Sequence, residues 1–367
     1  MRATRSRCLI FTLLGLVAAT VQSAPSLDQL TLQKRFHISL YADHLSDARE
    51  IALGEKGTVF VGSSNAGRVY ALTDSQHLGI ADRTRVIATG LEPPIGAAFK
   101  DGDLYVSTVS RIVVLRDIDN HLDAPPKPEV IIDRLPTETH HGDKFIAFGP
   151  DGKLYVPIGA PCNVCEPGPD HGKLTRMNDD GSGMENVARG IRNSVGFDWQ
   201  PGTGQLWFTD NGRDLLGDDV LSDELNRITR SDEDFGFPYC HQGDTLDPDF
   251  GKGKRCSNYS PPVLKLGAQV AALGMRFYDG SQFPAAYQGA IIVAEHGSWN
   301  RSKKSAYRVM MVRSQGSTIV AYEPLITGFM QNEQAWGRPV DVQPLPDGSV
   351  LLSDDLADAV DRITYQR

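Results

Sequence analysis

The stretch GPDGKLYVPIGAP, from Gly149 to Pro161, joins a tight turn to a short strand. The GPDG segment holds the glycine, proline and aspartate that favour turns, and KLYVPIG contains the β-branched and aromatic residues that favour strands. A break of small residues follows, and then a second strand-like segment, GKLTRM (172–177). This order of turn, strand, break and strand is the unit from which we predict the fold.

The same unit recurs along the chain at a spacing of about fifty residues, with one longer gap. The other copies are EKGTVFVGSSNAGRVYAL (55–72), KDGDLYVSTVSRIVVLRD (100–117), PGTGQLWFTDNGRD (201–214) leading to ELNRIT (224–229), YQGAIIVAEHGSWN (287–300) leading to YRVMMV (307–312), and LPDGSVLLSDDLADAVDRITY (345–365). A unit of about four strands repeated six times predicts an all-β fold, a six-bladed β-propeller. A pair of β-sandwiches would not explain the recurring order. We expect FHISLYA (36–42) to add a strand that closes the ring and removes exposed sheet edges.

The N-terminus has the pattern of a secretory signal peptide. MRATRSR is basic, and CLIFTLLGLVAAT is apolar but too short to span a bilayer comfortably. We expect residues 1–23 to be a signal peptide cleaved near Ser23, and residues 24–367 to form a single propeller domain. An uncleaved membrane anchor is the alternative. No later segment is apolar enough to be transmembrane, so we expect a secreted or periplasmic protein with no stable membrane insertion.

Export agrees with the cysteines. Apart from one in the signal segment, the cysteines are Cys162, Cys165, Cys240 and Cys256. An even number in an oxidising compartment suggests two disulfides, and of the three possible pairings we predict that neighbours pair: Cys162 with Cys165, and Cys240 with Cys256. A zinc site would need a second CxxC or a histidine pair at ligand spacing, which the chain lacks. The second disulfide would cross-link the long segment 232–263.

Charge argues against one class of partner. The formal net charge is −9 and no basic stripe appears, so nucleic acid is not an expected partner.

Unusual polar residues occupy the same position in different repeats. His141 precedes the strand of the third repeat, Arg192 and Asn193 precede that of the fourth, and Arg338 precedes that of the sixth. Ring symmetry would bring them together at the propeller axis. Two arginines there suit carboxylate binding, and one histidine supplies a base. Each residue alone has a simpler explanation, a surface histidine or a structural salt bridge, and the shared register is what favours a joint site.

Glycine turns follow two of the strands, in TDNGRD (209–214) and AEHGSWNRS (294–302). Such turns expose backbone carbonyl oxygens, which are hard ligands suited to Ca²⁺. An ordinary Asx turn is the alternative for the first segment.

Together these features resemble the soluble, pyrroloquinoline-quinone (PQQ) dependent sugar dehydrogenases, among them the glucose dehydrogenases. The chain is most similar to their sorbosone dehydrogenase-like branch, which in turn resembles the fungal PQQ pyranose dehydrogenase domain. The resemblance covers nearly all of the chain after the signal segment, and it implies a six-bladed propeller.

The resemblance also implies roles for individual residues. The family's catalytic histidine lies eight residues before the glycine of a GPD turn, which matches His141 before Gly149. The positions that match cofactor and metal contacts are Arg192, Asn193 and Arg338 for PQQ, and Gly212 and Arg213 for Ca²⁺. The family's fifth-blade lysine has no clean counterpart; GSWNRSKKS (297–305) offers Arg301, Lys303 and Lys304, of which we favour Arg301. The chain departs from the glucose dehydrogenases at Val340, where they have a second arginine, so glucose is not the expected substrate.

By this resemblance the protein is a PQQ- and calcium-dependent oxidoreductase that acts on a sugar or a sugar-derived aldehyde such as sorbosone. His141 would take a proton from the substrate while hydride moves to the quinone. With no haem motif in the chain, electrons would pass to an external acceptor, a cytochrome or a quinone. The alternatives are a lactonase-like calcium-dependent hydrolase and a non-catalytic binding propeller of the cell envelope.

Overall fold

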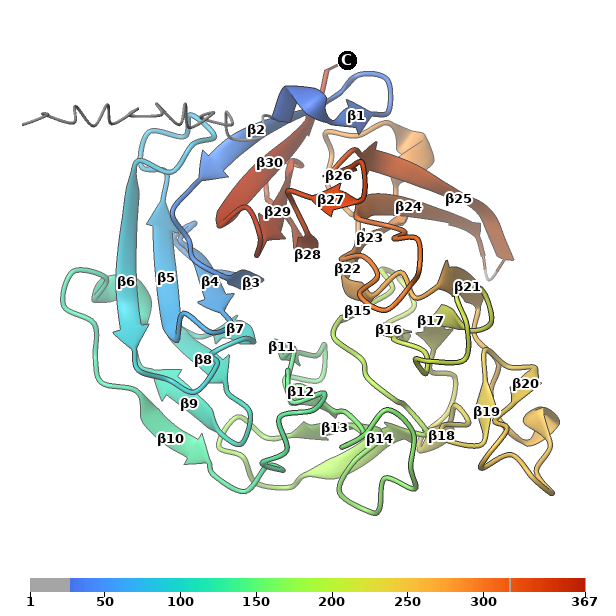
Figure 1. The fold of residues 1–367 in the computed structure, drawn as a ribbon. Coiled ribbons are helices and arrows are strands. Elements are labelled where there is room, and N and C mark those ends of the chain that lie inside the picture. Colours follow the sequence, from blue (N-terminus) through green and yellow to red (C-terminus); the bar gives the residue numbers. More distant parts are fainter. Residues whose placement is uncertain (1–26, 317, 367) are drawn as a thin grey trace, which may run out of the picture.

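The computed structural model describes residues 27–316 and 318–366, which form a ring of six sheets around a central axis (Figure 1). The predicted six-bladed β-propeller is therefore confirmed. Four short 3₁₀ helices accompany the strands: η1 (Leu27–Gln29), η2 (Ile118–Asn120), η3 (Cys256–Asn258) and η4 (Ala285–Tyr287). The predicted signal peptide lies outside the described residues.

Each blade is built on four antiparallel strands, which follow one another from the axis outward. Blade one contains β3 (Ala48–Leu53), β4 (Val59–Ser63), β5 (Arg68–Thr73) and β6 (Arg83–Thr89). Blade two contains β7 (Ala97–Lys100), β8 (Asp103–Ser107), β9 (Ile112–Leu115) and β10 (Glu129–Ile132). Blade three contains β11 (Ala147–Phe148), β12 (Leu154–Ile158), β13 (Lys173–Met177) and β14 (Glu185–Arg189), with β18 (Glu233–Asp234) added in parallel.

Blade four contains β15 (Phe197–Trp199), β16 (Leu206–Asp210), β17 (Ser222–Arg227) and β21 (Leu264–Ala268). Blade five contains β22 (Ala272–Phe277), β23 (Ile291–Glu295), β24 (Arg308–Gln315) and β25 (Thr318–Thr327), with β1 (Thr31–Leu32) at its edge. Blade six contains β28 (Pro339–Pro344), β29 (Val350–Asp354), β30 (Ala359–Tyr365) and β2 (Phe36–Ala42). Two small hairpins stand apart: β19 (Cys240–His241) with β20 (Thr245–Leu246), and β26 (Met330–Gln331) with β27 (Gln334–Ala335).

The first and last long strands of the described chain meet in blade six. Strand β2 pairs with β30, with Phe36 opposite Tyr365 and Ile38 opposite Ile363. The N-terminal strand therefore completes the last blade, as predicted, and the ring is held closed by backbone hydrogen bonds rather than by loops.

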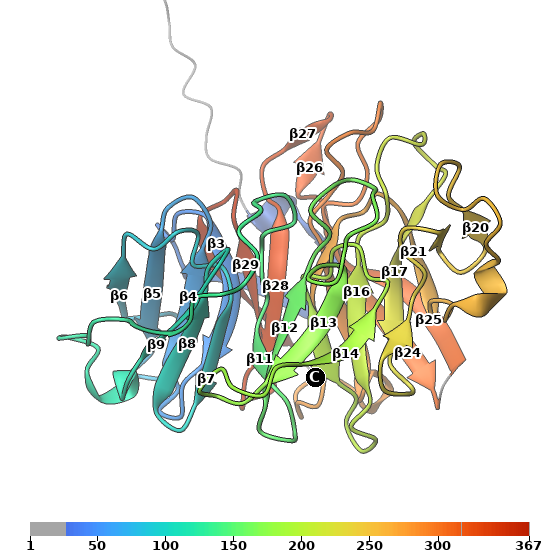
Figure 2. The same ribbon diagram turned by 90° about the horizontal axis from the view of Figure 1, so that it is seen from below.

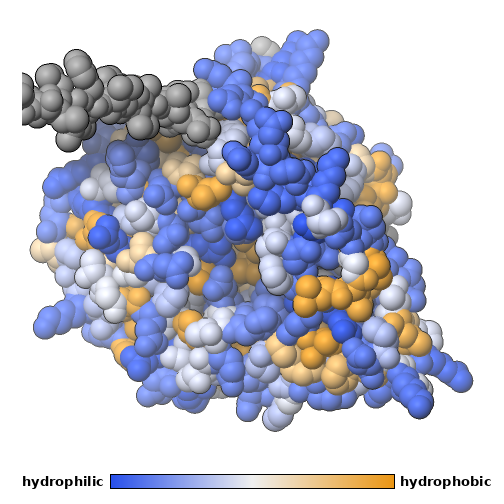
Figure 3. Space-filling model, viewed as in Figure 1, coloured by the Kyte–Doolittle hydropathy of each residue, from blue (hydrophilic) through white to orange (hydrophobic). Residues whose placement is uncertain are grey.

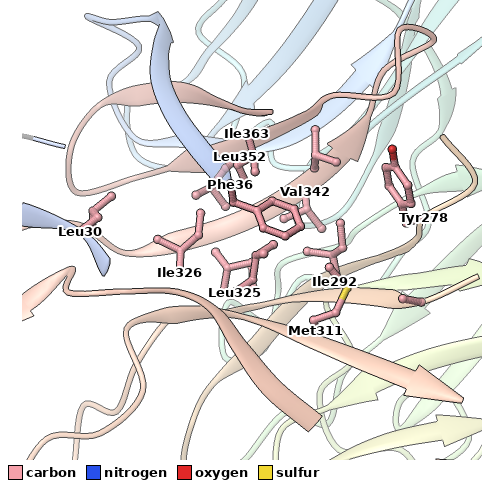
Figure 4. Close-up of a cluster of buried hydrophobic side chains, with 14 of the residues drawn as sticks. Leu30, Phe36, Tyr278, Ile292, Met311, Leu325, Ile326, Val342, Leu352 and Ile363 are labelled. Carbon is pink, nitrogen blue, oxygen red and sulfur yellow. The ribbon is translucent and has the colours of Figure 1, made fainter. Parts of the chain in front are cut away.

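Hydrophobic clusters fill the spaces between neighbouring blades. The one between blades five and six includes Phe36, Met311 and Leu352, which point toward one another in Figure 4. Phe36 packs edge-on against Phe283, with ring centroids 4.8 Å apart. A large side chain that is fully buried contributes about 1.5–3 kcal/mol, so these layers supply most of the stabilisation that holds blade to blade.

Buried carboxylates on the inner strands cross-link the blades. Oε2 of Glu50 on β3 accepts hydrogen bonds from the backbone N–H of Ala97 at 3.0 Å and of Ile146 at 3.1 Å. Oδ2 of Asp341 on β28 accepts one from the N–H of Ile51 at 3.0 Å. These bonds satisfy donors near the axis, where inner strands are too far apart to pair with one another.

Both predicted disulfides are present. Cys162 is bonded to Cys165, and Cys240 to Cys256. The second bridge lies in the segment between β18 and β21, which projects from the outside of blade four (Figure 1). No helix in the part of the chain that the structure describes is long and apolar enough to cross a membrane.

Candidate functional site

The candidate site lies at the end of the propeller that carries the β26–β27 hairpin, toward the viewer in Figure 1 and at the top of Figure 2. The β26–β27 hairpin and several loops rise above the sheets there (Figure 2). Hydrophilic residues dominate this face, and hydrophobic residues occur in separate patches (Figure 3). The side chains of Val195, Leu273 and Val340, from blades four, five and six, are buried and pack together. Val340 therefore belongs to a small apolar cluster.

His141 lies in the loop before β11 and is held in a defined tautomer. Its backbone has a left-handed conformation, with φ of 51°, and it is followed by Gly142. Ring atom Nδ1 is 2.9 Å from the carbonyl oxygen of Ala160. Because a carbonyl only accepts, Nδ1 must carry the proton, and Nε2 of the neutral ring keeps its lone pair.

The charge state of His141 follows from its surroundings. Burial lowers its pKa to about 3, and the positive charge of Arg192 and the neighbouring His140 act in the same direction. The ring is therefore neutral across the ordinary pH range, as a proton acceptor must be. His140 is exposed, and its ring centroid lies 4.1 Å from that of His141.

Gly159, just after β12, lets two predicted site residues approach its backbone closely, because a side chain there would have no room. A Cβ atom at this position would lie 2.6 Å from Cβ of His141 and 3.3 Å from Oδ1 of Asn193. That Oδ1 is buried and has no hydrogen-bond partner among the residues that the structure describes. The structure thus brings His141 and Asn193 together across a glycine, and it leaves a polar atom there without a partner, which is costly unless a ligand or water satisfies it.

Asp210, at the end of β16, positions the predicted Arg-Asn pair. Its carboxylate accepts the backbone N–H of Arg192 at 3.0 Å and that of Asn193 at 2.6 Å. Burial raises the pKa of Asp210, and these two donors oppose that shift. Sequence reasoning did not single out Asp210, although this residue lies within the glycine-turn segment TDNGRD.

The guanidinium of Arg192 is largely engaged within the protein. Nε donates to the carbonyl oxygen of Asn163 at 2.8 Å, and Nη1 donates to that of Asn211 at 3.0 Å. Nη2 donates to Oδ1 of Asn163 at 2.9 Å and to Oδ2 of Asp214 at 2.8 Å. One of the five guanidinium N–H groups has no partner among the described residues, and the charge of Arg192 is paired with that of Asp214.

Arg338 has more free donors. Nε donates to the carbonyl oxygen of His296 at 3.2 Å and Nη2 to that of Gly297 at 3.1 Å. The guanidinium lies 5.7 Å from the ring centroid of Tyr307. Within residues 27–316 and 318–366 no carboxylate forms an ion pair with Arg338. This half-buried cation can therefore pair with a carboxylate of a ligand.

A half-buried pair of a histidine and an aspartate was not predicted from the sequence. Nε2 of His296 lies 2.9 Å from Oδ1 of Asp355, and Asp355 also accepts from Arg49 at 2.9 Å. Burial lowers the pKa of His296 and outweighs the raising effect of Asp355. His296 could have been noticed in AEHGSWNRS, where it directly follows strand β23. Its partner Asp355, however, is remote in the sequence.

The predicted metal ligands lie in the loop after β16. The N–H of Gly212 donates to Oδ1 of Asp223 at 2.7 Å, which orients the turn. The side chain of Arg213 points to the cross-linked segment, where it pairs with Asp247 and, at 2.9 Å, with Asp249. The backbone carbonyls of Gly212 and Arg213 accept no hydrogen bond from other described residues. No group of three or more His, Cys, Asp or Glu side chains suited to a metal occurs in the described part of the chain.

Arg301 is engaged elsewhere. Its guanidinium donates to the carbonyl oxygens of Asp218, Ala268 and Lys303, and Nη2 pairs with Asp219 at 2.8 Å. It joins its own loop to the loop between β16 and β17, which also carries Gly212 and Arg213, and none of these bonds involves His141, Asn193 or Arg338. Its predicted contact with a cofactor stays a prediction.

Solved structures with the same fold share this architecture. A calcium structure of a Trichoderma reesei enzyme of carbohydrate-active enzyme family AA12 superposes with a TM-score of 0.82 at 17% identity, covering 92% of this chain and 97% of that one. The holo form of the pyranose dehydrogenase PQQ domain from Coprinopsis cinerea gives a TM-score of 0.76 at 17% identity, covering 94% and 99%. The PQQ-bound aldose sugar dehydrogenase from Streptomyces coelicolor gives 0.66 at 18% identity, covering 92% and 100%.

Sequence comparison identifies the family. A curated relative from Borreliella burgdorferi, described as an uncharacterized protein, is 31% identical over 374 residues, covering 98% of this chain and 97% of the relative. The family model described as domain of unknown function DUF7133 matches residues 22–360. The chain belongs to the DUF7133 family.

Proposed function

We propose that the protein is a PQQ- and calcium-dependent oxidoreductase that oxidises a sugar or a sugar-derived aldehyde, such as sorbosone. The fold matches that of PQQ-dependent sugar dehydrogenases, which supports a general oxidoreductase role. The observation that carries the proposal is the neutral His141, whose ring is fixed through Nδ1 so that Nε2 keeps its lone pair, and which packs with Asn193 against Gly159.

The residues present fit a ligand with several carboxylates. Arg338 is a half-buried cation without an ion-pair partner in the described chain, and Arg192, whose charge is paired with Asp214, keeps one guanidinium N–H for a ligand. The unpartnered Oδ1 of Asn193 marks the place where a polar group is missing; rotation of the amide would present its NH₂ to a ligand oxygen instead. The free carbonyls of Gly212 and Arg213 have the hard oxygen chemistry that Ca²⁺ prefers.

When bound, PQQ supplies an ortho-quinone that oxidises the substrate, and Ca²⁺ supplies a Lewis acid that polarises the quinone. The chain's own contribution is the proton chemistry and the positioning. Nε2 of His141 takes the proton from a substrate hydroxyl or aldehyde hydrate, while the bond from Nδ1 to Ala160 keeps the ring oriented. Asp210 holds the backbone of Arg192 and Asn193, so the cation and the amide keep a fixed relation to that base.

We further propose that the protein works in a secreted or periplasmic setting. The two disulfides suit an oxidising compartment, and the basic and apolar N-terminal segments have the pattern of a signal peptide. The reduced site would pass its electrons to an external cytochrome or quinone.

The test is a reconstitution assay. Purified mature protein is titrated with PQQ and Ca²⁺, and dye reduction is followed with a panel of sugars and aldehydes. The proposal predicts no turnover without cofactor, turnover with both present, and loss of turnover with a chelator. Binding of PQQ without turnover of any substrate would favour the non-catalytic binding propeller.

A further inference from the structure

The disulfide Cys162–Cys165 closes a four-residue loop directly beside the candidate site. The loop follows β12, three residues after Gly159, and so lies at the same end of blade three as His141. Between the two cysteines are Asn163 and Val164. The stability of the blade does not by itself require a cross-link at this place, because β12 is already paired on both sides by β11 and β13.

Asn163 contacts two segments of blade four through both its backbone and its side chain. Its carbonyl oxygen accepts from Nε of Arg192 at 2.8 Å, and its Oδ1 accepts from Nη2 of Arg192 at 2.9 Å. The same Oδ1 accepts from the backbone N–H of Asp214 at 2.9 Å, and Nδ2 donates to the carbonyl oxygen of Asp214 at 3.1 Å. One residue of blade three therefore holds both the arginine and the turn that follows β16.

These contacts fix a buried charge pair. The side chains of Arg192 and Asp214 are 4% and 17% exposed, and Nη2 lies 2.8 Å from Oδ2. Two acceptors of a single residue must be in place together for the guanidinium to be satisfied, which demands a defined backbone conformation at Asn163. A disulfide across four residues restricts that backbone and lowers the entropy lost when the contacts form.

We propose that Asn163, constrained by the Cys162–Cys165 disulfide, is a positioning residue of the cofactor site. It sets the place of the Arg192 guanidinium and ties down the turn 211–214, which presents the carbonyls of Gly212 and Arg213. The role in ligand binding rests on the proposed function. The coupling of the loop to the turn does not, and it can be tested in the protein without ligand.

The first experiment measures hydrogen exchange at the amide of Asp214, which donates directly to Asn163. Two variants are compared with the wild type: Asn163→Ala, which leaves the disulfide intact, and the double variant Cys162→Ser/Cys165→Ser, which leaves Asn163 intact. Both should exchange this amide about tenfold faster or more, while amides of the core strands β16 and β29 stay protected. Val164→Ala is the matched control, because Val164 lies in the same loop and makes no hydrogen bond to Arg192 or Asp214.

Unchanged exchange at Asp214 in Asn163→Ala would overturn the inference, whether or not the double variant folds. Faster exchange in Asn163→Ala but not in the folded double variant would overturn the part assigned to the disulfide.

The second experiment titrates PQQ with Ca²⁺ into the same variants and follows turnover. We expect PQQ affinity to be roughly tenfold weaker in Asn163→Ala and in the double cysteine variant, with kcat recovered at saturating PQQ. The reason is that the loop orients the site but takes no part in proton transfer. Unchanged PQQ affinity in variants with a loosened Asp214 amide would refute a role in cofactor binding. If the wild type binds no PQQ, the proposed function fails, and the exchange data still decide whether the loop and the turn are coupled.

Discussion

Replacement of His141 isolates the proton chemistry from the rest of the site. His141→Gln removes the titratable ring, and its amide reaches the place of Nε2. His141→Asn keeps a donor near the place of Nδ1, which bonds to Ala160 at 2.9 Å, but removes the acceptor at Nε2. Neither amide is a base. If the basic nitrogen Nε2 is what matters, both variants should therefore lose turnover, although only His141→Asn can keep the bond to Ala160.

The size of the loss can be stated from the geometry. A positioned general base contributes typically ~10²–10⁴-fold, which corresponds to about 3–5 kcal/mol of barrier. We therefore expect kcat to fall at least ~10²-fold in both variants, with little change in PQQ affinity, since nothing in the structure makes His141 an anchor for carboxylates. His140→Gln is the control, because His140 is exposed, and its effect should be milder.

The pH dependence gives an independent readout. Burial and the nearby Arg192 lower the pKa of His141 to about 3, so the neutral base persists far below the usual histidine range. The acid limb of kcat/KM should consequently lie near pH 3 instead of near the ordinary histidine value of about 6.5. The assay is dye reduction at saturating PQQ and Ca²⁺, followed from about pH 3 to about pH 8. A larger defect at His140 than at His141, or an acid limb at the ordinary histidine pKa, would show that the base has been assigned to the wrong residue.

Further predictions concern the cofactor contacts, the glycine and acid stability. Arg338→Ala removes a charge-assisted contact worth about 1.5–3 kcal/mol, so PQQ affinity should fall roughly ten- to hundredfold, and saturating PQQ should restore much of the activity; a titration that leaves Kd unchanged would exclude this contact. Gly159→Ala places a methyl group 2.6 Å from Cβ of His141, so it should cost about 1–3 kcal/mol of stability in a urea titration and disturb PQQ binding; full activity and stability would show that the close approach of His141 and Asn193 to this glycine is not needed. His141 has a pKa of about 3 when folded and an ordinary one when unfolded, so the unfolded chain takes up the proton first as pH falls, and stability is lost between pH 6.5 and 3. His141→Gln should flatten this loss by up to about 1.4 kcal/mol per pH unit in urea titrations at several pH values, and identical slopes would contradict the buried, neutral ring.

Much of the fold could be predicted from the sequence because the signals are local. Each blade repeats a turn and a β-rich strand within a short window, and the closing strand FHISLYA is rich in residues that favour strands. Both disulfides join cysteines that are neighbours in the sequence, so pairing by proximity was sufficient.

For the site, the sequence could predict only which residues occupy equivalent positions in different repeats. Register placed His141 and Asn193 at one end of the ring, and the structure brings them together around Gly159. It could not show that Arg192 is engaged by Asn163, which is 29 residues away, or that His296 pairs with Asp355, 59 residues away. These contacts depend on how loops of different blades fold against one another, and no local pattern encodes that arrangement.

Calorimetric titration of PQQ into the calcium-loaded protein tests the central claim most directly. The claim is that the site formed by His141, Asn193 and Arg338 binds this cofactor. We predict saturable binding at one site per chain, weakened by Arg338→Ala and not by His141→Gln, with a gain in stability of about 2.7 kcal/mol at a hundredfold excess over Kd. Absence of any heat of binding, together with an unchanged melting temperature in the presence of PQQ and Ca²⁺, would contradict the account.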